Sequence, residues 1–140
     1  MEILSKDLTQ TKDLARRVAQ ELKPNGVLAL YGDLGSGKTT FTRYLVEELG
    51  FDSRVQSPTF VIVRHYKGHA QHGIKLVNHL DLYRLQTLGE LEDIGILELI
   101  NTPSAVTVIE WPEIAEPLLP ATTKKLYFKD EGGNKCIKYI

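Results

Sequence analysis

The sequence predicts an α/β fold in three layers, with helices on both faces of a sheet and a β-hairpin at the C-terminal end. Short apolar runs alternate with amphipathic stretches, as expected where strands alternate with helices. Val27–Tyr31 and Ala105–Glu110 are apolar enough to be buried parallel strands. The hairpin is indicated by Lys124–Lys129 and Lys135–Ile140, which flank the turn-forming segment Glu131–Asn134.

A glycine-rich segment directly follows the first of these strands. From Gly32 to Thr39 it matches the pattern G-x-x-x-x-G-K-[ST]. Glycines let the backbone wrap closely around a phosphate, and N–H groups of the loop and of the next helix face that phosphate. Lys38 adds a full positive charge, and the Thr39 hydroxyl is suited to magnesium. The order of strand, loop and helix therefore favours a P-loop NTPase-like domain over a glycine turn without a ligand.

Two amphipathic helices are predicted on either side of the strand Val27–Tyr31. The helix after the glycine loop repeats apolar residues at helical spacing and ends near Gly50: Phe41, Tyr44, Leu45 and Leu49. The N-terminal helix has an apolar stripe: Leu14, Ala15, Val18, Ala19 and Leu22. Thr11 stands just before this stripe, where a threonine commonly caps a helix.

Length and composition limit the class of protein. We expect the 140 residues to form one domain, 1–140. Lys and Arg number 17 and Asp and Glu 18, which argues against nucleic-acid binding driven by net charge. A single cysteine, Cys136, excludes an internal disulfide and is expected to be a small buried residue in a strand. Without a membrane-spanning run or a signal peptide, we expect a cytoplasmic location.

Two predicted strands end in carboxylates. Asp81 follows the strand Ile74–Leu80, which could lie beside the glycine loop, and Glu110 ends the strand Ala105–Glu110. At the carboxyl edge of a sheet, Asp81 could orient water or bind magnesium through water, and Glu110 could be a magnesium-side acid. Alternatively, Asp81 pairs with Arg84 and Glu110 is only an acidic residue at a strand end.

The segment between the second helix and the strand Phe60–Tyr66 is polar and contains a proline. Within it, Thr59 could direct a second hydroxyl to magnesium or to the terminal phosphate, although an ordinary loop is equally consistent with the spacing. A turn is expected at Gly68–Gly73, and its histidines, His69 and His72, are expected to be solvated because no third metal ligand accompanies them.

A further helix is expected after the strand that ends near Asp81. Thr87–Glu90 has the pattern of a capping box that opens a helix. Its buried face is expected to consist of Leu91, Ile94 and Leu97, with Gly95 as a possible break.

Four segments together resemble the bacterial tRNA threonylcarbamoyladenosine biosynthesis ATPases, the TsaE or YjeE family. They are Gly32–Thr40, Ser57–Phe60, His79–Leu85 and Glu110–Pro112. Many families share the first segment alone, whereas all four in this order within 140 residues are specific. The similarity runs from about Thr11 to the C-terminal hairpin.

The resemblance implies a small cytoplasmic ATPase that binds ATP or ADP with Mg²⁺. Such a protein works with TsaB and TsaD partners, and reaches tRNA through that complex, to modify adenosine 37 in tRNAs that read ANN codons. By position, the implied catalytic residues are Lys38, Thr59 and Asp81, and the implied metal ligands are Thr39 and Glu110. The implied nucleotide-binding residues are Thr11, Gly35, Ser36, Gly37, Lys38, Thr39, Thr40 and Trp111.

Three rival classes are weaker. A small-molecule or nucleotide kinase would need an arginine-bearing lid, and the insertion Lys67–Gly73 has no arginine. A GTPase would need Asn/Thr-Lys-x-Asp at a strand end, and neither Asn134–Ile137 nor Thr123–Leu126 supplies the aspartate. A non-catalytic nucleotide sensor is disfavoured by the presence of both Asp81 and Glu110.

Overall fold

The fold is a mixed α/β arrangement around a seven-stranded sheet in the order β1-β7-β6-β2-β5-β4-β3. The computed structural model describes residues 2–5, 7–51, 55, 62–71 and 73–139. The strands are β1 Glu2–Ser5, β2 Val27–Tyr31, β3 Val63–Gln71, β4 Ile74–Asp81, β5 Ala105–Glu110, β6 Lys124–Glu131 and β7 Asn134–Tyr139. The helices are α1 Leu8–Glu21, α2 Lys38–Glu48, α3 Leu88–Asp93, α4 Ile96–Ile100 and the 3₁₀ helix η1 Pro112–Leu118.

The middle of the sheet is parallel and its edges are antiparallel. β2 pairs in parallel with β5 and β6, and β4 pairs in parallel with β5. β3 adds antiparallel to β4 at one edge, while β7 and β1 add antiparallel beyond β6 at the other. The α/β class and the C-terminal hairpin predicted from the sequence are confirmed.

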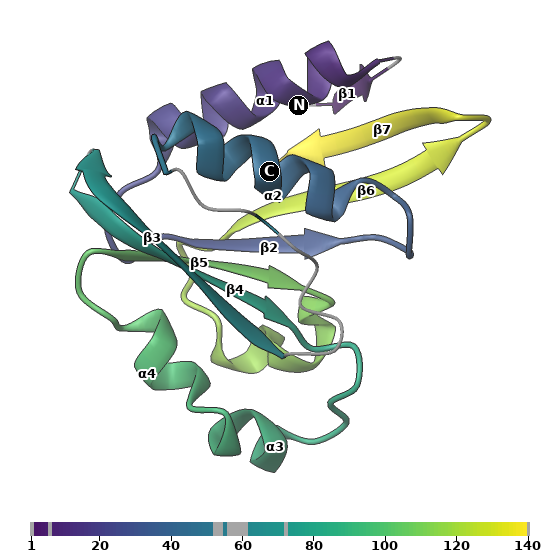
Figure 1. Cartoon of the computed structure of the whole chain (residues 1–140). Helices are drawn as coiled ribbons and strands as arrows, with labels where there is room; N and C mark the ends of the chain where they lie inside the picture. Colours follow the sequence, from purple (N-terminus) through teal and green to yellow (C-terminus); the bar gives the residue numbers. More distant parts are fainter. Residues whose placement is uncertain (1, 6, 52–54, 56–61, 72, 140) are drawn as a thin grey trace.

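Helices cover both faces of the sheet (Figure 1). α1 and α2 lie together on one face, and their buried side chains form a core with strand residues such as Leu28 and Val108. α3, α4 and η1 lie on the other face over a smaller core that includes Leu80 and Ile109. Among the described residues, none of the helices has both the length and the apolar character needed to cross a membrane.

The parallel register aligns the ends of three strands. Glu110 at the end of β5 is paired with Leu30 of β2 on one side and with Asp81 of β4 on the other. Both carboxylates therefore lie at the edge from which the glycine loop leaves β2. β5, not β4, is the direct neighbour of β2, so Asp81 faces the loop region from one strand further away.

The expected start of the N-terminal helix is wrong. α1 begins at Leu8, and its N-cap is Asp7, whose side chain accepts a hydrogen bond from the Thr9 amide at 2.9 Å. Thr11 is therefore a buried residue inside α1 and not its cap. The apolar stripe misled the prediction because the first turn of α1 carries the exposed Leu8 and polar residues.

The expected turn at residues 68–73 is too long. β3 continues through Gln71 and pairs with Ile74 of β4, with a register shift between Lys67 and Gln71. Gly68 lies inside this irregular strand, where a Cβ would lie 2.7 Å from the Phe51 ring. The close approach of Phe51 requires glycine there, so the residue that suggested a turn is explained by packing.

The helix predicted after Thr87 is present but divided. Thr87 is the N-cap and accepts from the Glu90 amide at 3.2 Å, as the capping pattern predicted. Gly95, at φ 73° and ψ 40°, ends α3 and starts α4. This break turns Ile96 towards the core and leaves Leu97 exposed, so the predicted burial of Leu97 is wrong.

The break at Gly95 gives a stability prediction. Gly95→Ala should lower the free energy of unfolding by about 1 kcal/mol, because alanine is strained in the left-handed region. Gly89→Ala is the matched control: Gly89 is an exposed residue inside α3, and a Cβ there would approach nothing closer than 3.8 Å. The control should gain about 0.5 kcal/mol in urea unfolding. A Gly95→Ala protein as stable as the control would contradict this account of the break.

Candidate functional site

The glycine loop is shaped by backbone conformations that require glycine. Gly32 has φ 143°, and a Cβ on it would lie 2.6 Å from the Phe128 carbonyl oxygen of β6. Gly37 has φ 106° and is the N-cap of α2, with no side chain capping the helix. As a glycine, Gly37 has no side chain to accept from the first amides of α2, and a helix N-terminus of this kind suits an anion.

A cavity of about 280 Å³ opens beside this loop at the carboxyl edge of the sheet. It is lined by the loop, the first turn of α2 and the two strand-end carboxylates. One residue directly after β5 and one near the start of β7 complete the lining. The lining residues are Leu34, Gly35, Gly37, Lys38, Thr39, Thr40, Asp81, Glu110, Trp111 and Lys135. The structure thus brings most of the predicted site residues together around one cavity.

Lys38 is the central cation of the site. It is 4% exposed, and its ammonium group donates to the Gly32 carbonyl oxygen of its own loop. The same nitrogen lies 4.0 Å from the centroid of the Trp111 ring. Burial lowers the pKa of Lys38, and nearby carboxylates, first among them Glu110 and then Asp81, oppose that shift. The protein therefore holds this positive charge at a cost in solvation and in a defined position.

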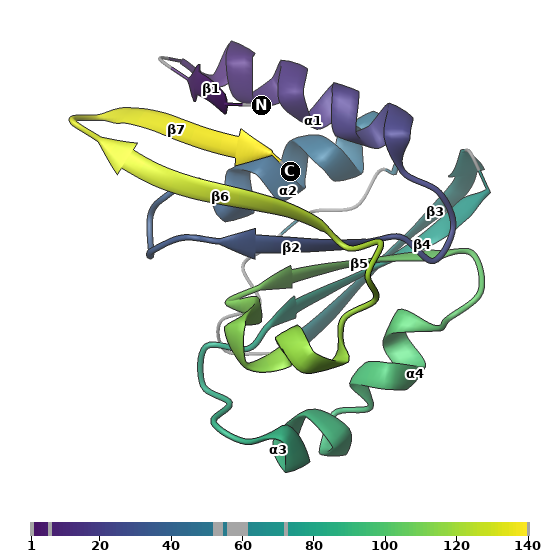
Figure 2. The same ribbon diagram turned by 180° about the vertical axis from the view of Figure 1, so that it is seen from behind.

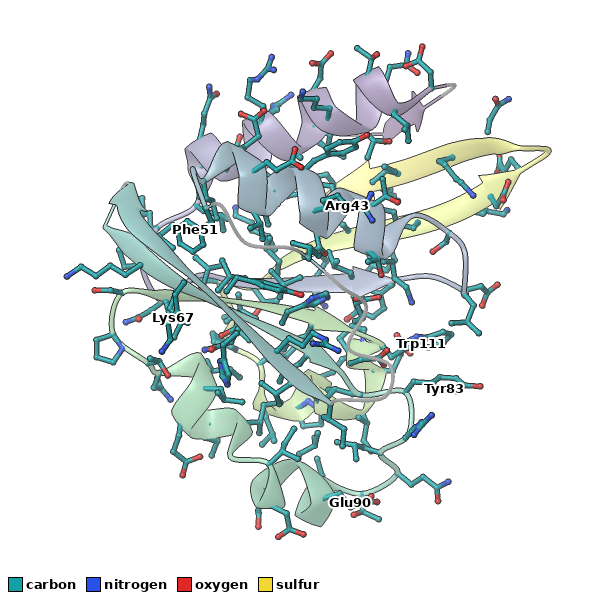
Figure 3. The ribbon with its side chains drawn as sticks, in the orientation of Figure 1. Arg43, Phe51, Lys67, Tyr83, Glu90 and Trp111 are labelled. Carbon is teal, nitrogen blue, oxygen red and sulfur yellow. The ribbon has the colours of Figure 1, made fainter. Side chains whose placement is uncertain are left out.

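Trp111 connects the end of β5 to the rest of the site. Its backbone is left-handed, at φ 55°, which is unusual for a bulky residue and places its ring beside Lys38. The ring also lies 4.8 Å from that of Tyr83, centroid to centroid, and Figure 3 shows the two side chains together. Trp111 lines the cavity, whereas Tyr83 is 56% exposed and packs on Trp111 from outside it.

Glu110 is held by a buried chain of hydrogen bonds across three strands. Its Oε2 lies 2.6 Å from His79 Nε2, and His79 Nδ1 lies 2.8 Å from the Tyr66 hydroxyl. All three residues are buried. Contacts of this kind fix the orientation of a carboxylate, as they do around metal ligands.

Asp81 is oriented by the backbone that follows it. Its Oδ1 accepts from the Tyr83 amide at 2.9 Å, an arrangement in which the side chain forms a local turn at the strand end. Asp81 is 5% exposed and lines the same cavity as Lys38 and Glu110. Two buried carboxylates thus face one buried ammonium group.

The donor set fits Mg²⁺ together with a phosphate chain. Thr39 and Glu110 line one cavity and offer hard oxygen ligands, which Mg²⁺ prefers. Within the described part of the chain, no group of three His, Cys, Asp or Glu side chains could hold a metal by itself. The buried Ser36 hydroxyl also finds no hydrogen-bond partner in that part, inside a loop whose backbone is shaped for an anion. A metal held by few protein ligands and by phosphate oxygens matches this site.

Some of the predicted residues are not among the described residues that line the cavity. Thr11 is buried in α1 and is not among the residues that line the cavity. Thr59 and His72 lie outside the described residues, and the side chain of His69 is likewise not described. Cys136 lies in β7 and is only half-buried, so its expected full burial is wrong.

No role was predicted for Lys135, which lines the cavity, or for His79 and Tyr83, which contact residues that line it. His79 and Tyr83 lie in the segment around Asp81, but their contacts depend on strand register and on the backbone turn of Trp111. Lys135 belongs to the hairpin, where the sequence indicated no site, yet it lines the cavity. Nothing in the sequence around Lys135 could have revealed this.

The fold and the site define a class: a mixed α/β protein with a glycine-rich loop, a helix N-terminus and two acids at the carboxyl edge of its sheet. The family model described as "Threonylcarbamoyl adenosine biosynthesis protein TsaE" matches residues 5–137. The chain belongs to the TsaE family.

Similar proteins agree with this assignment. The tRNA threonylcarbamoyladenosine biosynthesis protein TsaE of Bacillus subtilis (strain 168) is 37% identical over 126 residues, covering 90% of this chain and 75% of the relative. The protein of the same name from Rickettsia felis is 38% identical over 130 residues, covering 91% and 72%. The crystal structure of Bacillus subtilis YdiB matches with a TM-score of 0.80 and 28% identity, covering 99% of this chain and 83% of that one.

Burial of Lys38 predicts a pH dependence of stability. Because its pKa in the folded protein lies below the usual 10.5, the unfolded chain binds more protons between the two values. The contribution of Lys38 to the free energy of unfolding therefore rises with pH across that window. Lys38→Met should remove this rise and should be at least as stable as wild type at neutral pH.

Urea unfolding from neutral pH to about pH 10 measures both effects. Lys12→Met is the control, since Lys12 is an exposed residue of α1 and should leave the pH profile unchanged. If Lys38→Met is clearly less stable at neutral pH, the ammonium contacts with Gly32 and Trp111 outweigh the cost of burial, and our reading of the site is incorrect.

Proposed function

We propose that this protein binds Mg-ATP at the glycine loop and hydrolyses it slowly when alone. In this proposal the ATPase supports threonylcarbamoylation of adenosine 37 in tRNAs that read ANN codons, acting with TsaB and TsaD partners and reaching tRNA through them. The observation that supports it most is the single cavity that joins the glycine loop, Lys38, Asp81 and Glu110, in a chain of the TsaE family.

The loop residues would bind the phosphates of ATP or ADP. The amides of Gly35, Ser36 and Gly37, with those of Thr39 and Thr40 in the first turn of α2, would supply partial positive charge. The Lys38 ammonium would exchange its present neutral acceptor, the Gly32 carbonyl, for charged phosphate oxygens. Charge-assisted hydrogen bonds are stronger than neutral ones, which favours this exchange.

Thr39 and Glu110 would hold the magnesium ion. When bound, Mg²⁺ neutralises charge on the phosphates and orients them. The hydrogen bond from His79 keeps the Glu110 carboxylate turned in one direction, so little reorganisation is needed. Thr59 stays a candidate for a second hydroxyl at the terminal phosphate.

Asp81 would orient the attacking water and accept its proton. It lines the cavity and is fixed by the Tyr83 amide, so its carboxylate is already positioned. Trp111 would border the phosphates beside Lys38, and Thr11 would contact the nucleotide from α1. None of the arginines among the described residues lines the cavity, which is the reason to expect slow hydrolysis without a partner.

The first test concerns binding. Lys38→Ala should weaken Mg-ATP binding about a hundredfold in isothermal titration calorimetry, because the buried cation is lost. Thr39→Ala should keep ATP binding but remove its dependence on magnesium. Lys12→Ala, at an exposed position of α1, is the control. Unchanged ATP affinity in Lys38→Ala would show that the loop is not the nucleotide site.

The second test concerns catalysis. Asp81→Asn retains an acceptor for the Tyr83 amide but loses the charge, so it should bind ATP within about threefold of wild type. Phosphate release in the presence of TsaB and TsaD should fall about a hundredfold or more. Glu110→Gln should lose the same stimulated hydrolysis.

Three outcomes would refute the proposed function. These are full ATPase activity without partners, stoichiometric phosphoryl transfer from ATP to a nucleoside or metabolite acceptor, and normal threonylcarbamoyladenosine in tRNA from cells depleted of this protein. Each is measured without assuming the role of any single residue.

A further inference from the structure

The β6–β7 hairpin reaches back to the glycine loop. Figure 2 shows this hairpin as the long pair of strands beyond β2, with its turn on the same side as the loop that leaves β2. Lys135, the second residue of β7, donates from Nζ to the Gly35 carbonyl oxygen at 2.8 Å. One long side chain therefore links the hairpin to a loop 100 residues earlier in the sequence.

Lys135 is held in place from the hairpin side as well. Its Nζ donates to Asp130 Oδ2 at 2.8 Å, and the two residues are paired across the β6–β7 ladder. Asp130 in turn accepts from the Gly133 amide at 3.1 Å, which ties it to the turn. These contacts with Lys135 and Gly133 lower the pKa of Asp130, so its carboxylate stays ionised beside the lysine.

The surroundings of Lys135 leave room for a ligand. A primary ammonium group has three N–H donors, and the contacts with Gly35 and Asp130 use two of them. Lys135 lines the cavity, and a Cβ on Gly35 would meet nothing within 4 Å. Its side chain is 31% exposed, so it can move without disturbing the core.

The charges around the cavity favour a further cation beside Lys38 and the proposed magnesium ion. Lys38 is the buried cation there, and Asp81, Glu110, Glu113 and Asp33 all act on it electrostatically. A polyphosphate chain would add several more negative charges to this acidic surrounding. Lys135 is the other lysine that lines the cavity among the described residues.

We propose that Lys135 is a second phosphate-binding cation, supplied by the hairpin, that binds the polyphosphate of the nucleotide beside Gly35 of the glycine loop. In the absence of nucleotide, the Gly35 carbonyl and Asp130 hold its ammonium group in position. The inference rests on the proposed binding of Mg-ATP at the glycine loop. It also gives the hairpin a function beyond completing the sheet.

The test is isothermal titration of Mg-ATP into the full-length protein at several salt concentrations. Lys135→Ala should lower ATP affinity about tenfold at low salt and should make the affinity less dependent on salt, because an exposed charge acts through a screened interaction. Lys135→Arg should retain most of the affinity. The control is Lys129→Ala, an exposed lysine of the same hairpin that pairs with Glu131 at 3.5 Å and does not line the cavity.

The outcomes separate this inference from the proposed function. If Lys38→Ala loses binding while Lys135→Ala binds like wild type, Lys135 has no such role and the nucleotide site stands. If Lys129→Ala loses as much affinity, or if Lys135→Ala loses affinity with an unchanged salt dependence, the effect is structural and the inference is refuted. If wild type binds no ATP, the proposed function is wrong and this inference fails with it.

Discussion

The parallel pairing of β2, β5 and β4 is the constraint on which the rest of the structure depends. It aligns Leu30, Glu110 and Asp81 at one edge, so that two carboxylates and the start of the glycine loop meet. A shift of one residue in either pairing would turn the acids to the opposite face of the sheet. The two helical layers bury both faces of these strands and so fix that register.

The site that results is organised before any ligand arrives, at a cost in stability. Lys38 is buried with a lowered pKa, Trp111 has a strained backbone, and the Ser36 hydroxyl is buried without a partner among the described residues. Each feature is unfavourable in isolation and is maintained by the surrounding core. A group that neutralises Lys38 and accepts hydrogen bonds from the loop would relieve these costs, which is why we place the nucleotide here.

The sequence allowed most of the sheet and of the cavity lining to be predicted, because buried strands and the glycine pattern depend on local spacing. Contacts between residues far apart in the sequence could not be predicted from local spacing. The short edge strand β1 was missed, since its partner β7 lies more than 100 residues away in the sequence. Lys135 was missed because only the length and direction of the hairpin bring it to Gly35, and Leu97 was misplaced because Gly95 changes the helical phase.

The central claim is that nucleotide binds at the carboxyl edge of the sheet. The direct measurement is amide and indole NMR shifts of the labelled protein during titration with Mg-ATP, where the single tryptophan, Trp111, gives one indole signal. The account predicts saturable shifts centred on Gly35–Thr40 and on Glu110 and Trp111. A larger cavity, about 680 Å³, lies at residues 21–27 near Lys124, at the start of β2. Shifts centred there, or no shifts at millimolar ATP, would contradict the account.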